Sequence, residues 1–336
     1  MSLLQLDYHA SALEGMTIKG EKHGDLWTIV KRLEPKPTSG GNFSVCYDVR
    51  NSSGRIAFLK ASDVKLITKF SGKLTPAERL LAATSEFLFE CRILDACSGN
   101  SLDKIVTALD HGSVTFEHNG IQDVVFFIIF EPAVGDVRSS AVRNAVISPA
   151  WFLKALHNVA VGVSQLHRLK IAHNDIKPSN VLVFDRTLQK LADLGRATSD
   201  DISGPWDADH CVGDLTYTPP EMWGYKFDPK RIFNKITFES RAPCDIYLLG
   251  SLMVFFLAGE ALTPILRSFL QPHHRAENWN EDYEAVLPYI LTAHDEAMQL
   301  LRKTIESDWD QKYHVYLLDL LPLIAGLTCP DPRRRG

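Results

Sequence analysis

The sequence lacks any cysteine pattern that would hold a metal ion or a disulfide framework. Its six cysteines are scattered without a CxxC pair or a Cys/His cluster, a usage that favours a reducing, cytoplasmic compartment. The first ten residues, MSLLQLDYHA, lack the basic region and long apolar core of a signal peptide. The longest apolar run, Ile246 to Ala258, contains Gly250 and Ser251 and falls short of the roughly 18 residues that span a bilayer. A buried helix is expected there.

A strong charge bias is also absent. The 36 basic and 41 acidic residues give a net charge of -5, so nothing indicates a nucleic acid or an anionic membrane as partner. No internal repeat or low-complexity segment is present, and nothing indicates an oligomeric state. With 45% hydrophobic and 23% charged residues, the chain has the composition of a globular protein. Its 336 residues suffice for one large two-lobed domain or two ordinary ones.

The first part of the chain has the alternation typical of β-strands, with one helix among them. Residues 1–23 have no clear period and are interpreted as an N-terminal extension. The pattern predicts a helix over residues 76–97 and strands at 25–30, 43–49, 55–60, 104–109 and 120–130. Pro132 and Gly135 then interrupt regular structure, and the composition changes from strands to helices. We therefore expect one lobe over residues 24–131 and a second over 132–336.

Helical patterns dominate the second part. They predict helices at 149–168, 244–258, 261–270, 283–305 and 313–327. Two short apolar runs, 181–184 and 190–192, have the pattern of a hairpin. Such a hairpin would hold Asn180 near Asp193. Residues 196–218 are polar and too long for a plain connection, which favours a functional loop.

The residues best suited to a chemical role lie in two stretches, His173 to Val183 (HNDIKPSNVLV) and residues 191–195 (LADLG). Asp175, Asp193 and Asn180 offer two carboxylates and one carboxamide, which are suitable ligands for a metal-bound phosphate. Three other features carry weaker signals. The Gly40-Gly41 pair would let backbone N–H groups approach a phosphate, although an ordinary hairpin turn has the same pattern. Lys60 at a strand end and Glu90 on a helix face are equally typical of solvated positions.

The order and spacing of these residues resemble those of a eukaryotic-type (Hanks-type) serine/threonine protein kinase domain, from about residue 25 to Arg335. Asp175-x-Lys177-Pro178-x-Asn180 is followed by Asp193-Leu194-Gly195, whose aspartate comes eighteen residues after Asp175. Pro219-Pro220-Glu221, then Asp245 with Gly250, then Asp331-Pro332-Arg333-Arg334-Arg335 come next in the family's order. The resemblance implies an α+β, bilobal protein-kinase-like fold. Its N-lobe would be an antiparallel sheet with one helix, its C-lobe mainly helical, and ATP would bind in the cleft.

The resemblance also implies a role for each residue. Asp175 would orient the substrate hydroxyl and accept its proton, and Lys177 would neutralise the transferring phosphoryl group. Asn180 and Asp193 would bind Mg²⁺. ATP would be bound by the phosphate-loop residues Gly40, Gly41 and Phe43, by Lys60 paired with Glu90, and by the backbones of Glu131 and Ala133 in the connector after Phe130. Asp245 would brace the catalytic loop and Glu221 would pair with Arg335. The substrate would be a protein.

Four departures from the family pattern bear on activity. Ser39 and Ser44 replace phosphate-loop glycines. Phe58 occupies the position where the family has a small residue that covers the adenine ring, unless a local bulge brings Ala57 to that position. Asn174 replaces the arginine that clamps a phosphorylated loop, which predicts activity independent of loop phosphorylation. Asp214 replaces a threonine; it would accept from Lys177 but would repel Asp175.

Two alternatives to a protein kinase therefore stay open. One is a catalytically weak or inactive kinase-like module that binds nucleotide or serves as a scaffold. The other is a small-molecule kinase of the aminoglycoside type, against which Lys177-Pro178 and Pro219-Pro220-Glu221 argue. Arg335 is the penultimate residue, which fits an excised domain of a longer protein or a short natural protein.

Overall fold

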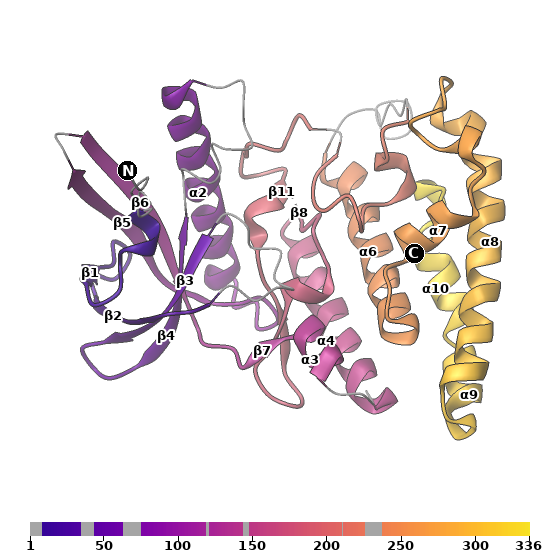
Figure 1. Ribbon diagram of the computed structural model, residues 1–336, viewed down its shortest axis with the longest axis horizontal. Helices are drawn as coiled ribbons and strands as arrows, with labels where there is room; N and C mark the ends of the chain where they lie inside the picture. The colour runs from indigo at the N-terminus through magenta and orange to yellow at the C-terminus, as the bar shows by residue number, and fades with distance from the viewer. Residues whose placement is uncertain are drawn as a thin grey trace, which may run out of the picture. The chain divides into compact units, whose positions relative to one another are not determined.

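The computed structural model describes residues 9–34, 44–62, 75–118, 121–143, 148–209, 211–225 and 237–336. The chain forms two compact units, Met1–Gly135 and Asp136–Gly336, and each is described by itself. The first contains most of the β-structure and the second most of the helices (Figure 1).

Unit 1 is built on a six-stranded antiparallel sheet of order β1-β2-β3-β4-β6-β5. The strands are β1 (Thr17–Lys19), β2 (Leu26–Arg32), β3 (Ser44–Asn51), β4 (Ile56–Ser62), β5 (Ala108–His118) and β6 (Ile121–Phe130). A short 3-10 turn, η1 (His9–Ser11), precedes the sheet. The sheet was expected, but β5 begins at Ala108 and replaces the strand expected at 104–109. Ile105 and Val106 are buried in the connection before it, which is why that apolar run has the composition of a strand.

One face of the sheet packs into a closed apolar core. Ala57, Leu59 and Ala61 of β4 are fully buried there. The segment before residue 24 contributes to the same core, because Ala10 and Leu13 are buried in it and the Tyr47 hydroxyl donates to Ala10 O at 2.5 Å. Strand alternation then places Phe58 and Lys60 on the opposite face of the sheet.

The helix of unit 1, α2 (Pro76–Gly99), confirms the one expected at 76–97. A capping box fixes its start: Thr75 Oγ1 accepts from Glu78 N–H, and the Glu78 carboxylate accepts from Thr75 N–H at 2.7 Å. Its Phe87 ring stacks on Phe126 of β6, with ring centroids 4.8 Å apart. The helix therefore packs on β5 and on β6, the strand that carries Phe130.

Unit 2 is mainly helical. Its helices are α3 (Val137–Arg143), α4 (Pro149–Arg168), α6 (Phe238–Ala258), α7 (Leu262–Phe269), α8 (Tyr283–Asp308), α9 (Gln311–Leu318) and α10 (Leu321–Leu327). Its short strands are β8 (Ile171–Ala172), β9 (Val181–Val183), β10 (Gln189–Leu191) and β11 (Thr198–Ser199), and β7 (Gly135–Asp136) lies at the junction with unit 1. The single-turn 3-10 helices are η2 (Pro178–Asn180), η3 (Leu194–Arg196), η4 (Pro220–Met222), η5 (Pro272–His274) and η6 (Pro332–Arg334).

The long apolar run forms the central helix of unit 2, as expected. α6 packs against α4, α8 and α10 (Figure 1). By length and composition, α6 is long and apolar enough to cross a membrane, and the mean hydropathy of its most apolar 18-residue window is 1.4. However, 67% of that window is buried inside the structure. Its apolar side chains thus build the core of the unit.

One expected helix is divided. Residues 313–327 form two helices, α9 and α10, separated by Asp319 and Leu320. Pro322 lies in the first turn of α10, where its missing N–H costs nothing, whereas in a continuous helix it would remove a hydrogen bond. The helix α3 was not predicted, because its seven residues, VRSSAVR, have no clear apolar stripe.

Candidate active site

The stretch His173 to Asn180 is held in place by one buried carboxylate, Asp245 of α6. Asp245 is fully buried, and it accepts hydrogen bonds from the backbone N–H groups of His173 (2.8 Å) and Asn174 (2.7 Å). The ring of His167 lies 2.9 Å from the same carboxylate. The predicted bracing of this loop by Asp245 is confirmed.

The ring of His173 connects this loop to the segment that ends at Asp193. Its Nδ1 accepts from Asp175 N–H at 3.3 Å, so its proton is on Nε2, which lies 3.1 Å from Ala192 O and donates to it. The imidazole thereby fixes the backbone before both aspartates.

The carboxylate of Asp175 is almost fully buried and accepts from three sides. Asn180 Nδ2 donates to its Oδ2 at 3.0 Å, Lys177 Nζ lies 3.1 Å from the same oxygen, and the backbone N–H of Asp214 donates to Oδ1 at 2.9 Å. Burial raises the pKa of Asp175; Lys177 opposes this change and the nearby Asp193 carboxylate adds to it. The structure thus brings together Asp175, Lys177 and Asn180, as the sequence predicted.

Asp214 supports Asp175 and Lys177 more than it disturbs them. Its Oδ2 lies 3.2 Å from Lys177 Nζ, and its Oδ1 accepts from the backbone N–H of Thr216 at 3.0 Å. Burial alone would raise the pKa of Asp214, but the Thr216 N–H and Lys177 outweigh it and lower the pKa. The expected repulsion is offset because Lys177 lies between the two carboxylates, and because Asp214 presents its N–H to Asp175.

Gly213 makes this approach possible, and its role was not predicted from the sequence. Its φ is +94°, and a Cβ there would lie 2.3 Å from Asn174 O. Only glycine allows the two backbones to meet so closely. A glycine directly before Asp214 was the available signal.

The hairpin of β9 and β10 brings the two predicted metal ligands near one another. The two strands pair antiparallel as expected, and Ala192 N–H donates to Asn180 O at 2.9 Å. Asp193 is exposed, with φ of +65°. Within the described residues no group of three or more His, Cys, Asp or Glu side chains could hold a metal ion.

The donor set of Asn180 and Asp193 nevertheless fits Mg²⁺. The Asn180 amide N–H groups are directed to Asp175 O and Oδ2. Its Oδ1 meets, among the described residues, only the Ser179 hydroxyl at 3.4 Å. A carbonyl oxygen and an exposed carboxylate match the preference of Mg²⁺ for one or two protein oxygens together with substrate phosphates.

In unit 1 the expected ion pair is present. Lys60 Nζ of β4 lies 3.8 Å from Glu90 Oε1 of α2, and Glu90 is 9% exposed. Phe58 shares the Lys60 face and is the direct cross-strand partner of Phe130. The pairing of β4 is continuous with both neighbouring strands. The alternative in which a bulge brings Ala57 to the Phe58 position is therefore wrong, because Ala57 is fully buried in the core on the other face.

The other predicted nucleotide ligands remain predictions. The N–H of Glu131 donates to Thr107 O at 3.1 Å, so its carbonyl is the backbone group that could face an adenine. Ala133 is half-buried. Gly40, Gly41 and Phe43 lie outside the described residues.

The loop after Asp193 is tied to the stretch His173 to Asn180 by Asn174, which is 1% exposed and has φ of +62°. Its Nδ2 lies within 3.3 Å of Ala172 O, 3.0 Å of Arg196 O and 3.1 Å of Thr198 Oγ1. The bonds to Arg196 and Thr198 hold the start of the loop and its strand β11. In the family pattern an arginine at this position pairs with a phosphorylated loop. Asn174 has a neutral amide instead, which holds the loop through groups that carry no phosphate.

Two further residues hold the same loop, and neither was predicted from the sequence. Trp206 Nε1 donates to Gly195 O at 2.6 Å, and the Arg196 guanidinium lies 3.9 Å from the centre of its ring. Arg241 of α6, which is buried, donates to the backbone carbonyls of Trp206 and Asp209. No sequence period marks contacts of this kind between a loop and a helix.

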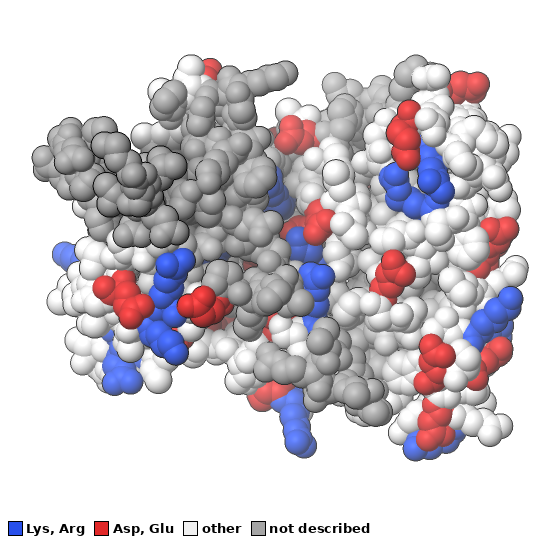
Figure 2. Space-filling view, in the orientation of Figure 1, with Lys and Arg blue, Asp and Glu red and all other residues white. Residues whose placement is uncertain are grey.

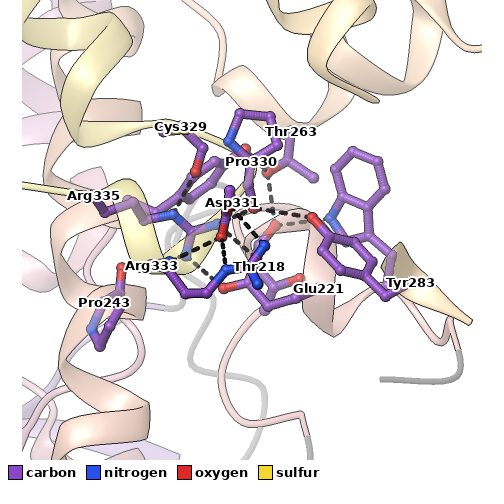
Figure 3. Close-up of polar contacts among 12 residues, drawn as sticks. Thr218, Glu221, Pro243, Thr263, Tyr283, Cys329, Pro330, Asp331, Arg333 and Arg335 are labelled. Atoms are coloured by element: carbon purple, nitrogen blue, oxygen red, sulfur yellow. Dashed lines mark hydrogen bonds and ion pairs between the residues drawn. The ribbon is translucent and has the colours of Figure 1, made fainter. Parts of the chain in front are cut away.

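Glu221 and Arg335 form the predicted pair (Figure 3). The two guanidinium nitrogens of Arg335 lie 2.5 and 2.6 Å from the two carboxylate oxygens of Glu221. Arg335 also donates to Cys329 O at 2.6 Å and to Pro330 O at 3.1 Å. The Arg335 side chain is 0% exposed and the Glu221 side chain is 5% exposed. The pair therefore joins parts of unit 2 that are distant in the sequence, inside the core of the unit.

Comparison with known proteins agrees with this geometry. A family model described as "Protein kinase domain" matches residues 39–318. The chain is 27% identical over 237 residues to the mitosis inhibitor protein kinase mik1 of Schizosaccharomyces pombe, covering 68% of this chain and 35% of that protein. It is 26% identical over 201 residues to the serine/threonine-protein kinase PKH3 of Eremothecium gossypii, covering 57% and 24%. It is 24% identical over 183 residues to the serine/threonine-protein kinase PrkC of Bacillus subtilis, covering 52% and 26%.

The chain belongs to the protein kinase family. It spans between 24% and 35% of the length of these three relatives.

Proposed function

We propose that the protein transfers the γ-phosphoryl group of Mg-ATP to serine or threonine hydroxyls of a protein, and that the two units are the two lobes of a kinase fold. The observation that carries the proposal is the arrangement around Asp175. Its carboxylate is held by Asn180, Lys177 and Asp214 within 2.9 to 3.1 Å. A loose phosphoryl transition state needs positioning and charge neutralisation more than covalent chemistry, and these contacts supply both.

Within this proposal Asp175 receives the acceptor hydroxyl on Oδ1. Its Oδ2 already accepts from Asn180 and Lys177, whereas Oδ1 meets only the Asp214 N–H among the described residues. One lone pair of Oδ1 thus stays available for a substrate O–H. Because burial raises the pKa of Asp175, the carboxylate holds a proton better than an exposed one.

Lys177 is the cation of this proposal. Burial alone would lower its pKa, but Asp175 and Asp214 outweigh burial and raise it, so the ammonium stays charged. Mg²⁺ held by Asn180 and Asp193 would neutralise charge on the ATP phosphates. In unit 1, Lys60 paired with Glu90 would bind the α- and β-phosphates.

The partner and the location are also part of the proposal: a protein substrate in the cytoplasm, with no nucleic acid or membrane partner. In the described part of the face in view, acidic and basic side chains are interspersed (Figure 2). That distribution supports recognition of a protein segment over binding to a polyanion.

The alternative is a kinase-like module with weak or no catalysis, and Phe58 favours it. A phenyl ring on the Lys60 face, opposite Phe130, would crowd an adenine that binds there. A small-molecule kinase loses support, because the three relatives described above are protein kinases by name.

Radiolabelled ATP with generic protein substrates tests the proposal, with Asp193→Ala and Asp175→Asn compared with the unmodified chain. We expect incorporation that both substitutions lower by at least about a hundredfold. Equal incorporation by the unmodified chain and Asp193→Ala would refute catalysis. Absence of any thermal shift with saturating Mg-ATP would favour a scaffold that does not bind nucleotide, since a bound ligand must stabilise the fold.

A further inference from the structure

Residues 20–25, here called the strap, connect β1 to β2. β1 and β5 are the two edge strands of the sheet, and the strap bonds to β5. Glu21 N–H donates to His111 O at 2.8 Å, and Glu21 Oε1 accepts from both the N–H and the hydroxyl of Ser113 at 3.0 Å. The strap therefore joins the two edges and closes the sheet around its core.

A buried carboxylate fixes the path of the strap. Asp110 of β5 is fully buried, and its Oδ1 accepts from Lys22 N–H at 3.0 Å while its Oδ2 lies 3.3 Å from Trp27 Nε1. At Gly20 a Cβ would lie 1.8 Å from Asp110 Oδ2, so any other residue would displace the strap or the carboxylate. The backbone around Lys22 is thus held against β5.

From this position the strap reaches α2. Lys22 Nζ lies 2.5 Å from Asp95 Oδ1, and the two side chains are 22% and 45% exposed. Asp95 follows Glu90 by five residues, which places the two about 140° apart around a helix of about 100° per residue. Since Glu90 pairs with Lys60 of β4, α2 is held on two different sides by two ion pairs.

We propose that the strap is a positioning element for α2, and that the Lys22–Asp95 pair keeps Glu90 in reach of Lys60. Rotation of α2 about its axis that carried Glu90 away would also separate Asp95 from Lys22. A partly exposed ion pair shifts the equilibrium between two helix orientations by about two- to fivefold. Only the role of Lys60 and Glu90 in binding nucleotide rests on the proposed function.

Hydrogen–deuterium exchange of α2 in the full chain without nucleotide tests the proposal. The variants are Lys22→Glu, Asp95→Lys, the double exchange of both charges, and Lys19→Glu as a control. Lys19 is an exposed residue of β1, and its substitution changes the net charge as Lys22→Glu does. We expect two- to fivefold faster exchange over residues 86–97 in each single variant, restoration in the double variant and no change in the control. Single variants that exchange like the unmodified chain, or a double variant that is not restored, would overturn the proposal.

A second measurement separates this proposal from the proposed function. If the protein is a kinase, the single variants raise the KM for ATP about two- to fivefold, and the double variant restores it, with kcat changed less. If no variant turns over ATP while exchange follows the expected pattern, the kinase proposal fails and the positioning role stands. If all variants turn over ATP equally and exchange is unchanged, the positioning role fails alone.

Discussion

The buried pair of Glu221 and Arg335 gives the sharpest prediction of stability. Replacing Arg335 with Met roughly keeps the length of the side chain but leaves the Glu221 carboxylate without its charged partner and without both N–H donors of that guanidinium. Glu221 is 5% exposed at its side chain, so water cannot compensate. Removing one partner of such a pair costs about 3–5 kcal/mol. For a unit of this size, each kcal/mol lowers Tm by about 2–4 °C, and a decrease of roughly 6–20 °C follows.

Arg333→Met is the matched control. Arg333 also forms a two-pronged pair, with Asp331 at 2.7 and 2.8 Å, but its side chain is 52% exposed. Water reaches the half-exposed Arg333 guanidinium and screens the pair although Asp331 is buried, so Arg333→Met should cost at most about 1 kcal/mol. The two arginines are two residues apart, so the comparison isolates burial from geometry.

Urea unfolding at pH 7 followed by circular dichroism measures both variants, together with the double variant Glu221→Met/Arg335→Met. The double variant should recover much of the stability that Arg335→Met loses, because no unpaired charge remains in the core. An Arg335→Met variant within about 1 kcal/mol of the unmodified chain would refute the reasoning. A double variant less stable than Arg335→Met would also refute it.

Three further predictions concern pH, the loop and the nucleotide. Burial lowers the pKa of His294 to about 4 from 6.5, so below pH 6.5 the unfolded chain binds a proton that the folded chain does not. The free energy of unfolding therefore decreases as the pH is lowered from 7 to 5. In urea unfolding, His294→Gln should make this decrease smaller by about 2 kcal/mol. An equal decrease in both proteins would contradict this. Phosphatase treatment should leave kinase activity unchanged, and a large loss of activity after this treatment would show that phosphorylation is needed. Asn174→Gly should lower kinase activity severalfold, because glycine tolerates the positive φ but lacks the side-chain amide. Phe58→Ala should tighten Mg-ATP binding about tenfold by calorimetry, with exposed Ile56→Ala of the same strand face as control; unchanged affinity would show that the phenyl ring does not obstruct nucleotide.

The sequence predicted those parts of the molecule that depend on local order. Asp175, Lys177 and Asn180 lie within six residues of one another, so any backbone that places one places the others nearby. The α2 and α6 helices were also predictable, since apolar residues mark them directly. Lys60 and Glu90 were placed by family spacing, and the ion pair between them is present.

Contacts between distant segments were not predictable. The sequence suggested that Asp214 would repel Asp175, because residue types alone do not show that its backbone N–H would face that carboxylate. Trp206 and Arg241 belong to a polar loop and a helix start, and no period connects them. The position of Phe58 was left open until strand pairing fixed which side chains share a face.

Closure of the sheet by the strap also covers part of an edge that could otherwise pair with a strand of a second copy. An edge strand offers unpaired N–H and C=O groups to any other strand, including that of a second copy, and such edges lead to aggregation. Here one edge is the three-residue β1, and the other, β5, is bonded to the strap at His111 and Ser113. A chain that begins at residue 24 would lose β1 and most of the strap, exposing β2 and β5 together. We therefore expect a chain that begins at residue 24 to associate with itself more readily than the full chain.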